Sequence, residues 1–281
     1  MNQSASRARR IAFRVFLGLL LVGLLGPEGW TWTLPIATWL PDNIVNDFLA
    51  SRVDQASIHR IHLMEKGLAH VIVTLGFLMQ VGRPLRNEAS MWLSSAFFVL
   101  AIVLNLAAGT VSAGLLPPQI YAIFAVGILI GILHPSAPLV HLPRPTRRPL
   151  LGLTAVMAAP MGVYAVRQFG LQAGGAASNP HWDAVHYIFS SEIGFLLILG
   201  GVVSASRFTG WRATTWMTGL AAVVLGAISV AFPTQDSSPG IGWGIALALW
   251  GVVFIATGVF TGASSEGVES TTALERSEIG A

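Results

Sequence analysis

The chain has no cysteine and little charge. The lack of cysteine excludes disulfides, iron–sulfur clusters, thiolate zinc sites, covalent c-type haem attachment and any cysteine nucleophile. Only 10% of the 281 residues are charged and 53% are hydrophobic, whereas about a quarter of the residues in soluble domains are charged. The composition therefore excludes a soluble domain and indicates an integral membrane protein.

Eight apolar runs are long enough to cross about 30 Å of hydrocarbon, which takes roughly 20 helical residues. They fall at 11–27, 59–81, 91–110, 116–134, 150–167, 185–205, 212–232 and 241–261. Four arginines lie before and at the start of the first run, as in a signal peptide, but no small-x-small cleavage site follows Leu25 and Gly26. We expect it to be an uncleaved span, so the sequence predicts an all-α integral membrane protein with eight transmembrane helices.

Basic residues are concentrated in every second loop, which predicts the orientation, because Lys and Arg are enriched in short cytoplasmic loops. With the N-terminus inside, only Arg52, Arg60 and Arg167 face outward. The cytoplasmic side then receives Arg7, Arg9, Arg10, Arg14, Arg83, Arg86, Arg144, Arg147, Arg148, Arg207, Arg212 and Arg276. The pattern predicts a multi-pass protein of the cell membrane with both termini in the cytoplasm. It also explains the positive net charge without a nucleic-acid partner.

Two of the predicted spans share a sequence motif. The second and the sixth span both contain H-x5-E-x-G, which begins at His59 in one and at His186 in the other, an offset of 127 residues. Four spans return the chain to its starting side. The sequence therefore predicts two parallel four-helix repeats related by an axis along the membrane normal.

These observations predict five segments along the chain. They are a cytoplasmic basic N-terminus (1–10), a first four-helix repeat (11–134) with an outer loop (28–57), a cytoplasmic basic linker (135–149), a second four-helix repeat (150–261) and a disordered cytoplasmic tail (262–281). In the outer loop, Ile44, Phe48, Leu49 and Val53 recur at helical spacing after Asp42, which predicts a short amphipathic helix. The tail is polar and rich in small residues, a composition typical of disorder.

The doubled four-helix unit, with histidines on its second and sixth spans, resembles haem A synthase in architecture. That family also has haem ligands on its fourth and eighth spans, whereas here the fourth has only His134, at its inner end, and the eighth has none. The family's acidic residue precedes its second-span histidine, whereas Glu65 follows His59. The resemblance covers the architecture alone, and no residue role is carried over.

Two buried carboxylates indicate where the chemistry could lie. Glu65 and Glu192 are the only acidic residues inside the apolar spans, and Lys66, the sole lysine, adjoins one of them. An ionisable side chain in the bilayer costs at least about 2.5–3.5 kcal/mol unless it is paired, protonated or hydrated, so its default interpretation is functional. We therefore predict catalytic or proton-transfer roles for Glu65, Glu192 and Lys66.

Histidines accompany both carboxylates. At about 100° per residue, His59, His62 and Glu65 form one stripe on their helix, and His186 and Glu192 form the equivalent stripe on the sixth span. If the two helices face each other, these five residues converge in an outward-opening pocket. Imidazole and carboxylate suit zinc, iron, copper or manganese, and His59 with His186 would also suit haem.

The sequence leaves three functions open. The first is a metal- or haem-binding membrane enzyme or redox protein with its site between helices 2 and 6. The second is a proton- or cation-coupled small-molecule transporter that uses Glu65 and Glu192, and the third is a non-catalytic membrane subunit or sensor. The alternative to all three is a structural role, with histidines at headgroup level and Glu65 paired with Lys66. The expected partners are the lipid bilayer and a small-molecule or lipid substrate, and the sequence does not indicate the oligomeric state.

Overall fold

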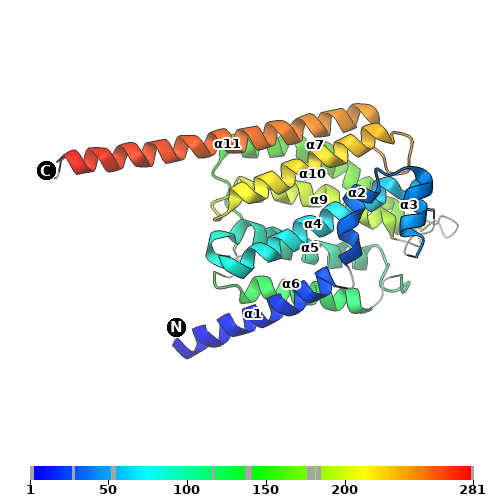
Figure 1. The fold of residues 1–281 in the computed structure, drawn as a ribbon, viewed down its shortest axis with the longest axis horizontal. Helices are drawn as coiled ribbons and strands as arrows, with labels where there is room; N and C mark the ends of the chain where they lie inside the picture. Colours follow the sequence, from blue (N-terminus) through cyan, green and yellow to red (C-terminus); the bar gives the residue numbers. More distant parts are fainter. Residues whose placement is uncertain are drawn as a thin grey trace.

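The computed structural model describes residues 3–26, 29–51, 55–115, 118–136, 141–175, 181 and 185–279. This part of the chain is all-helical and contains no strand, and one isolated bridge pairs Pro145 with Ser206. The predicted all-α fold is therefore confirmed. Figure 1 shows the long helices side by side in one bundle, with both ends of the chain at the same end of it.

Each of the long helices coincides with one of the predicted apolar runs. They are α1 (Gln3–Leu25), α4 (Arg60–Gly82), α5 (Glu88–Ala107), α6 (Pro118–Leu133), α7 (Arg148–Ala173), α9 (His186–Ser204), α10 (Trp211–Ala231) and α11 (Gly240–Ile279). Four short helices connect α1 to α4: η1 (Gly29–Thr33), α2 (Leu34–Ala37), α3 (Asp42–Leu49) and η2 (Ala56–His59). A further short helix, η3 (Pro84–Arg86), connects α4 to α5.

Six helical segments among the described residues are long and apolar enough to cross a membrane, which is consistent with a polytopic membrane protein. They are Ala56–Gly82, Glu88–Ala107, Arg148–Ala173, His186–Ser204, Trp211–Ala231 and Gly240–Thr261. The other two predicted spans differ. The arginine-rich α1 qualifies only together with the segment that follows it across a 63° bend. Helix α6 has 16 residues, which extend for about 24 Å, less than the hydrocarbon thickness.

Four helices form the centre of the bundle. Each of α4, α5, α9 and α10 contacts the other three, while α1 and α6 pack together on one side and α7 and α11 on the other. Small residues permit the closest approaches. A Cβ atom on Gly251 of α11 would lie 2.5 Å from the Gly219 carbonyl oxygen of α10, so glycine is required where these two helices meet.

The connector between α1 and α4 is folded onto one end of the bundle, where Figure 1 shows α2 and α3. Helix α3 confirms the short helix predicted in this loop. Of the residues predicted to form its apolar face, Leu49 is buried, Ile44 and Phe48 are exposed, and Val53 lies outside the described residues. Val45, which was not part of that prediction, is buried beside Leu49, so the packed face is rotated from the predicted one.

Arg60 attaches this connector to α4. Its guanidinium is buried and donates hydrogen bonds to the Thr38 carbonyl oxygen and, at 2.6 Å, to the Asp42 carboxylate. It also lies 4.7 Å from the ring centroid of Phe232. A buried guanidinium needs such partners, so the first residue of α4 is held in place beside the histidines that surround it in the sequence.

The ends of the chain differ from the predicted segments. Helix α1 begins at Gln3, inside the predicted basic N-terminus, and α11 continues to Ile279 through most of the predicted disordered tail. The segment 262–279 contains no proline, and its residues include the helix formers Ala, Leu, Glu and Arg. The described backbone of 262–279 is helical, and the predicted disorder of the tail stays a prediction. Residues 137–140 of the predicted linker lie outside the described residues.

Candidate functional site

Four histidine rings meet where α4 and α9 begin. His59 ends η2, His62 lies in the first turn of α4, His186 begins α9, and His181 precedes it in the chain. The ring centroid of His59 is 4.6 Å from those of His181 and His186, and the ring of His62 is stacked on that of His186 at 5.0 Å. We call these four residues the histidine cluster. Helices α4 and α9 do face each other here.

Two sets of three residues in the described chain offer ligand atoms that all lie within 4.8 Å of one another. One set is His59, His181 and His186, and the other is His62, His181 and Asp236. His59 and His186 are buried, whereas the Asp236 side chain is 41% exposed. The first set therefore provides three imidazoles in a sheltered position, which is a donor set that zinc, copper and iron accept.

Two buried ring nitrogens of the histidine cluster bear on whether it binds a ligand. Nε2 of His62 and Nδ1 of His186 are buried and have no hydrogen-bond partner among the described residues. Burying a polar group without a partner is unfavourable, and native proteins rarely leave such a group unsatisfied. A bound ion or ligand would satisfy these nitrogens, so they favour a binding role over a purely structural one.

His181 lies outside the candidate spans and is suited to bind metal at neutral pH. Burial lowers the pKa of its imidazole, the nearby His62 acts in the same direction, and Asp236 opposes both. The ring of His181 is therefore neutral at pH 7, which is the form that donates a lone pair to a metal ion.

Below the histidine cluster, Glu65 is the centre of a hydrogen-bonded network. Its side chain is fully buried and accepts hydrogen bonds from the Tyr164 hydroxyl and, at 2.5 Å, from the Ser190 hydroxyl. Nδ1 of His62 lies 3.0 Å from the Ser190 oxygen and 3.5 Å from a Glu65 oxygen. His62 therefore links Glu65 to the other three residues of the histidine cluster.

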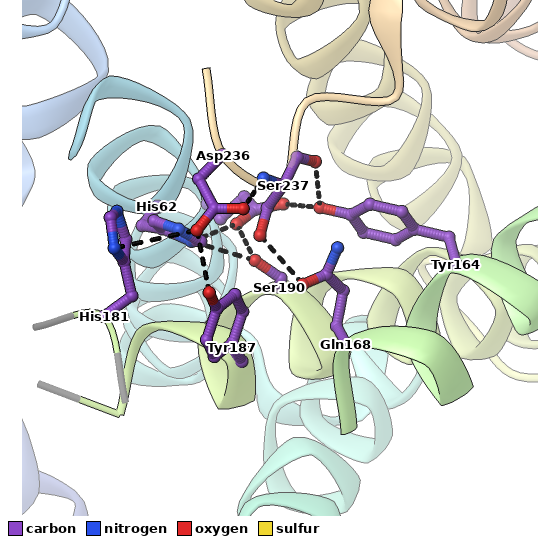
Figure 2. A network of polar contacts seen from close by, with 9 residues as sticks. His62, Tyr164, Gln168, His181, Tyr187, Ser190, Asp236 and Ser237 are labelled. Carbon is purple, nitrogen blue, oxygen red and sulfur yellow. Dashed lines mark hydrogen bonds and ion pairs between the residues drawn. The ribbon is translucent and has the colours of Figure 1, made fainter. Parts of the chain in front are cut away.

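The network returns to the histidine cluster along a second route, which Figure 2 shows. The Tyr164 oxygen lies 3.1 Å from the Ser237 carbonyl oxygen, and the neighbouring residue in the chain is Asp236. The Asp236 carboxylate accepts a 2.8 Å hydrogen bond from Tyr187 and lies 3.6 Å from Nδ1 of His181. Polar groups from α4, α7, α9 and the α10–α11 connection thus surround one site.

Glu192 and Lys66 belong to a different polar group. The Glu192 carboxylate is buried and accepts a 3.4 Å hydrogen bond from Asn105 of α5. The Lys66 ammonium lies 4.8 Å from the ring centroid of Trp30 and 5.2 Å from that of Phe189, and its charge acts on Glu192. The motif partners Glu65 and Glu192 therefore have separate surroundings.

The predicted metal ligands are only partly brought together. His59 and His186 share one ligand set, and His62 belongs to the other. Glu65 and Glu192 belong to neither set within the described chain. For Glu65 the reason is local, because each of its oxygens already accepts a hydroxyl hydrogen bond. The catalytic roles predicted for Glu65, Glu192 and Lys66 stay predictions.

Sequence reasoning missed several members of the site. His181 and Asp236 were not among the predicted site residues. Tyr164 was not predicted either. Tyr164 and Gln168 are polar residues four positions apart in an apolar helical segment, and residues at this spacing lie on the same face of a helix. The other missed members of the network are Tyr187, Ser190 and Ser237.

The helices and the histidine cluster define an all-helical protein that is consistent with the polytopic membrane class and carries a potential His/Asp metal site. Comparisons with family models, curated proteins and solved structures find no match. The function is therefore inferred from the chemistry of the site and not from analogy at the level of the fold.

Proposed function

We propose that the protein is a metal-dependent membrane enzyme whose ion is held by His59, His181 and His186. The observation that carries this proposal is the mutual approach of their ligand nitrogens to within 4.8 Å. Three protein ligands leave a position for water or substrate, as in catalytic zinc sites. An ion bound there would supply a Lewis acid that polarises a substrate oxygen or activates water.

A single ion suits the histidine cluster better than haem does. Bis-histidine haem ligation requires the macrocycle to lie between the two imidazoles. The rings of His59 and His186 are instead in edge contact, with centroids 4.6 Å apart and an angle of 66° between their planes. That separation leaves no width for a porphyrin, so we propose a divalent transition metal as the cofactor.

The neighbouring side chains are suited to orient a ligand and to accept protons. Asp236 lies beside Nδ1 of His181, and a carboxylate in that place fixes the orientation of a metal-binding imidazole. Within the histidine cluster, His62 contacts His186 on one side and Glu65 on the other. A proton released at the cluster would reach Glu65 through His62, as in general base catalysis.

We also propose that all eight long helices span the membrane as two parallel repeats. The same neighbours recur in each half: α1–α4, α4–α5, α5–α6 and α1–α6 correspond to α7–α9, α9–α10, α10–α11 and α7–α11. The distribution of arginines favours cytoplasmic termini. In the cell membrane, the histidine cluster would then lie at the outer face.

Metal analysis tests the proposed enzyme. We expect protein purified without chelator to contain about one zinc, copper, iron or manganese ion per chain by elemental mass spectrometry. The double variant His59→Ala/His186→Ala should lose it, whereas His141→Ala, an exposed histidine elsewhere, should retain it. Folded wild-type protein that contains no such ion, and takes up none on dialysis against each metal, would refute the proposal.

The second polar group supports a second candidate, a proton- or cation-coupled transporter. Glu192, Asn105 and Lys66 place a carboxylate, an amide and an ammonium among buried residues, and Glu192 belongs to neither ligand set in the described chain. Buried ionisable groups of this kind mark transport pathways. If Glu192 carries protons, proteoliposomes should acidify under an applied potential, and Glu192→Gln should abolish that flux without removing the metal. Equal flux in empty liposomes would exclude this candidate.

A further inference from the structure

A cavity of about 710 Å³ lies between α7, α10 and α11, and it is lined by Tyr164 but by none of the residues of the histidine cluster. This volume falls within the range of sites that bind small molecules, roughly 300–1,000 Å³. Exposed side chains such as Val163 and Trp243 form part of its wall. The cavity is therefore accessible from the surface that the bundle would present to lipid.

The cavity is long and follows the helices. On α7 its lining extends from Val156 to Arg167, a rise of about 16 Å at 1.5 Å per residue. The lining along most of this length is apolar, with Met157, Leu247 and Trp250 among its walls. A slot of this shape and chemistry suits an extended hydrocarbon or isoprenoid chain.

One end of the cavity is polar. Arg167 and Ser238 lie there. Arg167 is exposed and forms no ion pair with any residue in the described part of the chain. A guanidinium presents a fork of donors that matches a carboxylate or a phosphate. The polar end is therefore complementary to an anionic headgroup.

Tyr164 connects the cavity to the network around Glu65. It lines the cavity, and its hydroxyl donates a hydrogen bond to the Glu65 carboxylate. Figure 2 shows the Tyr164 hydroxyl directed toward the network, with Gln168, one turn further along α7, directed the same way. A headgroup at Arg167 would lie one helical turn from Tyr164, at the wall that separates the cavity from the proposed site.

We propose that this cavity binds a single-chain membrane amphiphile, with its tail along α7 and α11 and its anionic headgroup at Arg167. The binding itself does not depend on a metal. Only the further statement that this amphiphile is the substrate rests on the proposed function, because the Tyr164–Glu65 contact places the headgroup end beside the network that leads to the histidine cluster.

Two tryptophans of the cavity allow a direct test. The protein is placed in phosphatidylcholine nanodiscs, and a brominated stearic acid, which quenches indole fluorescence on contact, is titrated in. The variant Trp243→Phe/Trp250→Phe identifies the signal of these two residues. We expect saturable quenching, with displacement by unbrominated stearate. An alkyl phosphate of equal chain length shows by its relative potency whether a carboxylate or a phosphate is preferred.

Two matched pairs of variants make the test specific. Ala159 lines the cavity and Ala155, one turn away on α7, does not, although both are exposed. Ala159→Phe should weaken binding at least about tenfold, and Ala155→Phe should leave it unchanged. Arg167→Gln should weaken binding of the acid about tenfold, the loss of one charge-assisted hydrogen bond. It should not affect a brominated alcohol of equal length, and Arg148→Gln at the other end of α7 should have no effect.

The result separates this proposal from the proposed function. Quenching that never saturates, or that is equal in Ala159→Phe and Ala155→Phe, would show that bromine reaches the tryptophans only from bulk lipid and would overturn the proposal. The titration is repeated on His59→Ala/His186→Ala. Saturable binding that survives loss of the histidine cluster, in a protein found to contain no metal, would retain the amphiphile site and refute the enzyme.

Discussion

The two copies of the H-x5-E-x-G motif place their histidines together and their glutamates in different surroundings. His59 and His186 are in contact. Glu65, however, accepts two hydroxyl hydrogen bonds, whereas Glu192 accepts one amide hydrogen bond at 3.4 Å. A shared motif thus predicts where a side chain lies on its helix, while neighbouring helices determine its partners and hence its chemistry.

In both halves the partner comes from the opposite half of the chain. Tyr164 of α7 reaches Glu65 of α4, and Asn105 of α5 reaches Glu192 of α9. Replacing matched residues one at a time therefore measures how far the two halves have diverged. The predictions below compare such pairs.

The largest difference is expected between Glu65→Ala and Glu192→Ala. Loss of Glu65 removes an acceptor of the Tyr164 and Ser190 hydroxyls, which keep the Ser237 carbonyl oxygen and His62 Nδ1 as their other partners, and the two lost hydrogen bonds together cost about 1–3 kcal/mol. Loss of Glu192 affects one long hydrogen bond, which is worth about 1 kcal/mol. The apparent Tm in detergent should therefore fall further in Glu65→Ala, and Glu65→Gln, which keeps one acceptor oxygen, should lie between them. Equal losses would mean that the two sites are energetically equivalent.

A smaller difference is expected between the two motif glycines. A Cβ atom on Gly67 would lie 2.6 Å from Cδ of Pro35 in α2, whereas one on Gly194 would lie 2.9 Å from Cβ of Ala165 in α7. Overpacking typically costs about 1–3 kcal/mol, so both Gly67→Ala and Gly194→Ala should lower the Tm, and Gly67→Ala should lower it more. The opposite order would show that the short helix α2 moves aside more easily than the long helix α7.

The fold was largely predictable because apolar runs and helical periodicity are local properties of the sequence. Each of the eight runs contains most of a long helix or a large part of one among the described residues, and six contain segments of membrane-spanning length and hydropathy. The exceptions are also local. Helix α1 does not qualify alone as a membrane span because of its arginines, and α6 does not qualify because it is too short. Helix α11 continues as a helix past the end of its apolar part.

The site was predictable only along α4 and α9. The repeat placed His59 opposite His186, and the structure has them in contact. It could not supply His181, Asp236 or Tyr164, because their positions depend on how loops and a flanking helix pack onto the centre of the bundle. The same packing explains why Glu65 is surrounded by hydroxyls and stands apart from the ligand sets.

The smallest difference is expected between Asn105 and Ser229, which are buried near the C-terminal ends of α5 and α10. The Asn105 side chain donates hydrogen bonds to the Ala101 carbonyl oxygen and to Glu192 and accepts one from the Thr110 hydroxyl, while the Ser229 hydroxyl donates to the Leu225 carbonyl oxygen of its own helix. That carbonyl keeps its backbone partner when the hydroxyl is removed, and such bonds add little to helix stability. Asn105→Ala should therefore cost about 1 kcal/mol, seen as a modest fall in Tm, and Ser229→Ala close to nothing. If Ser229→Ala lowers the Tm as much as Asn105→Ala does, Ser229 supports Glu65 as Asn105 supports Glu192. The two halves would then share side-chain interactions as well as the arrangement of their helices.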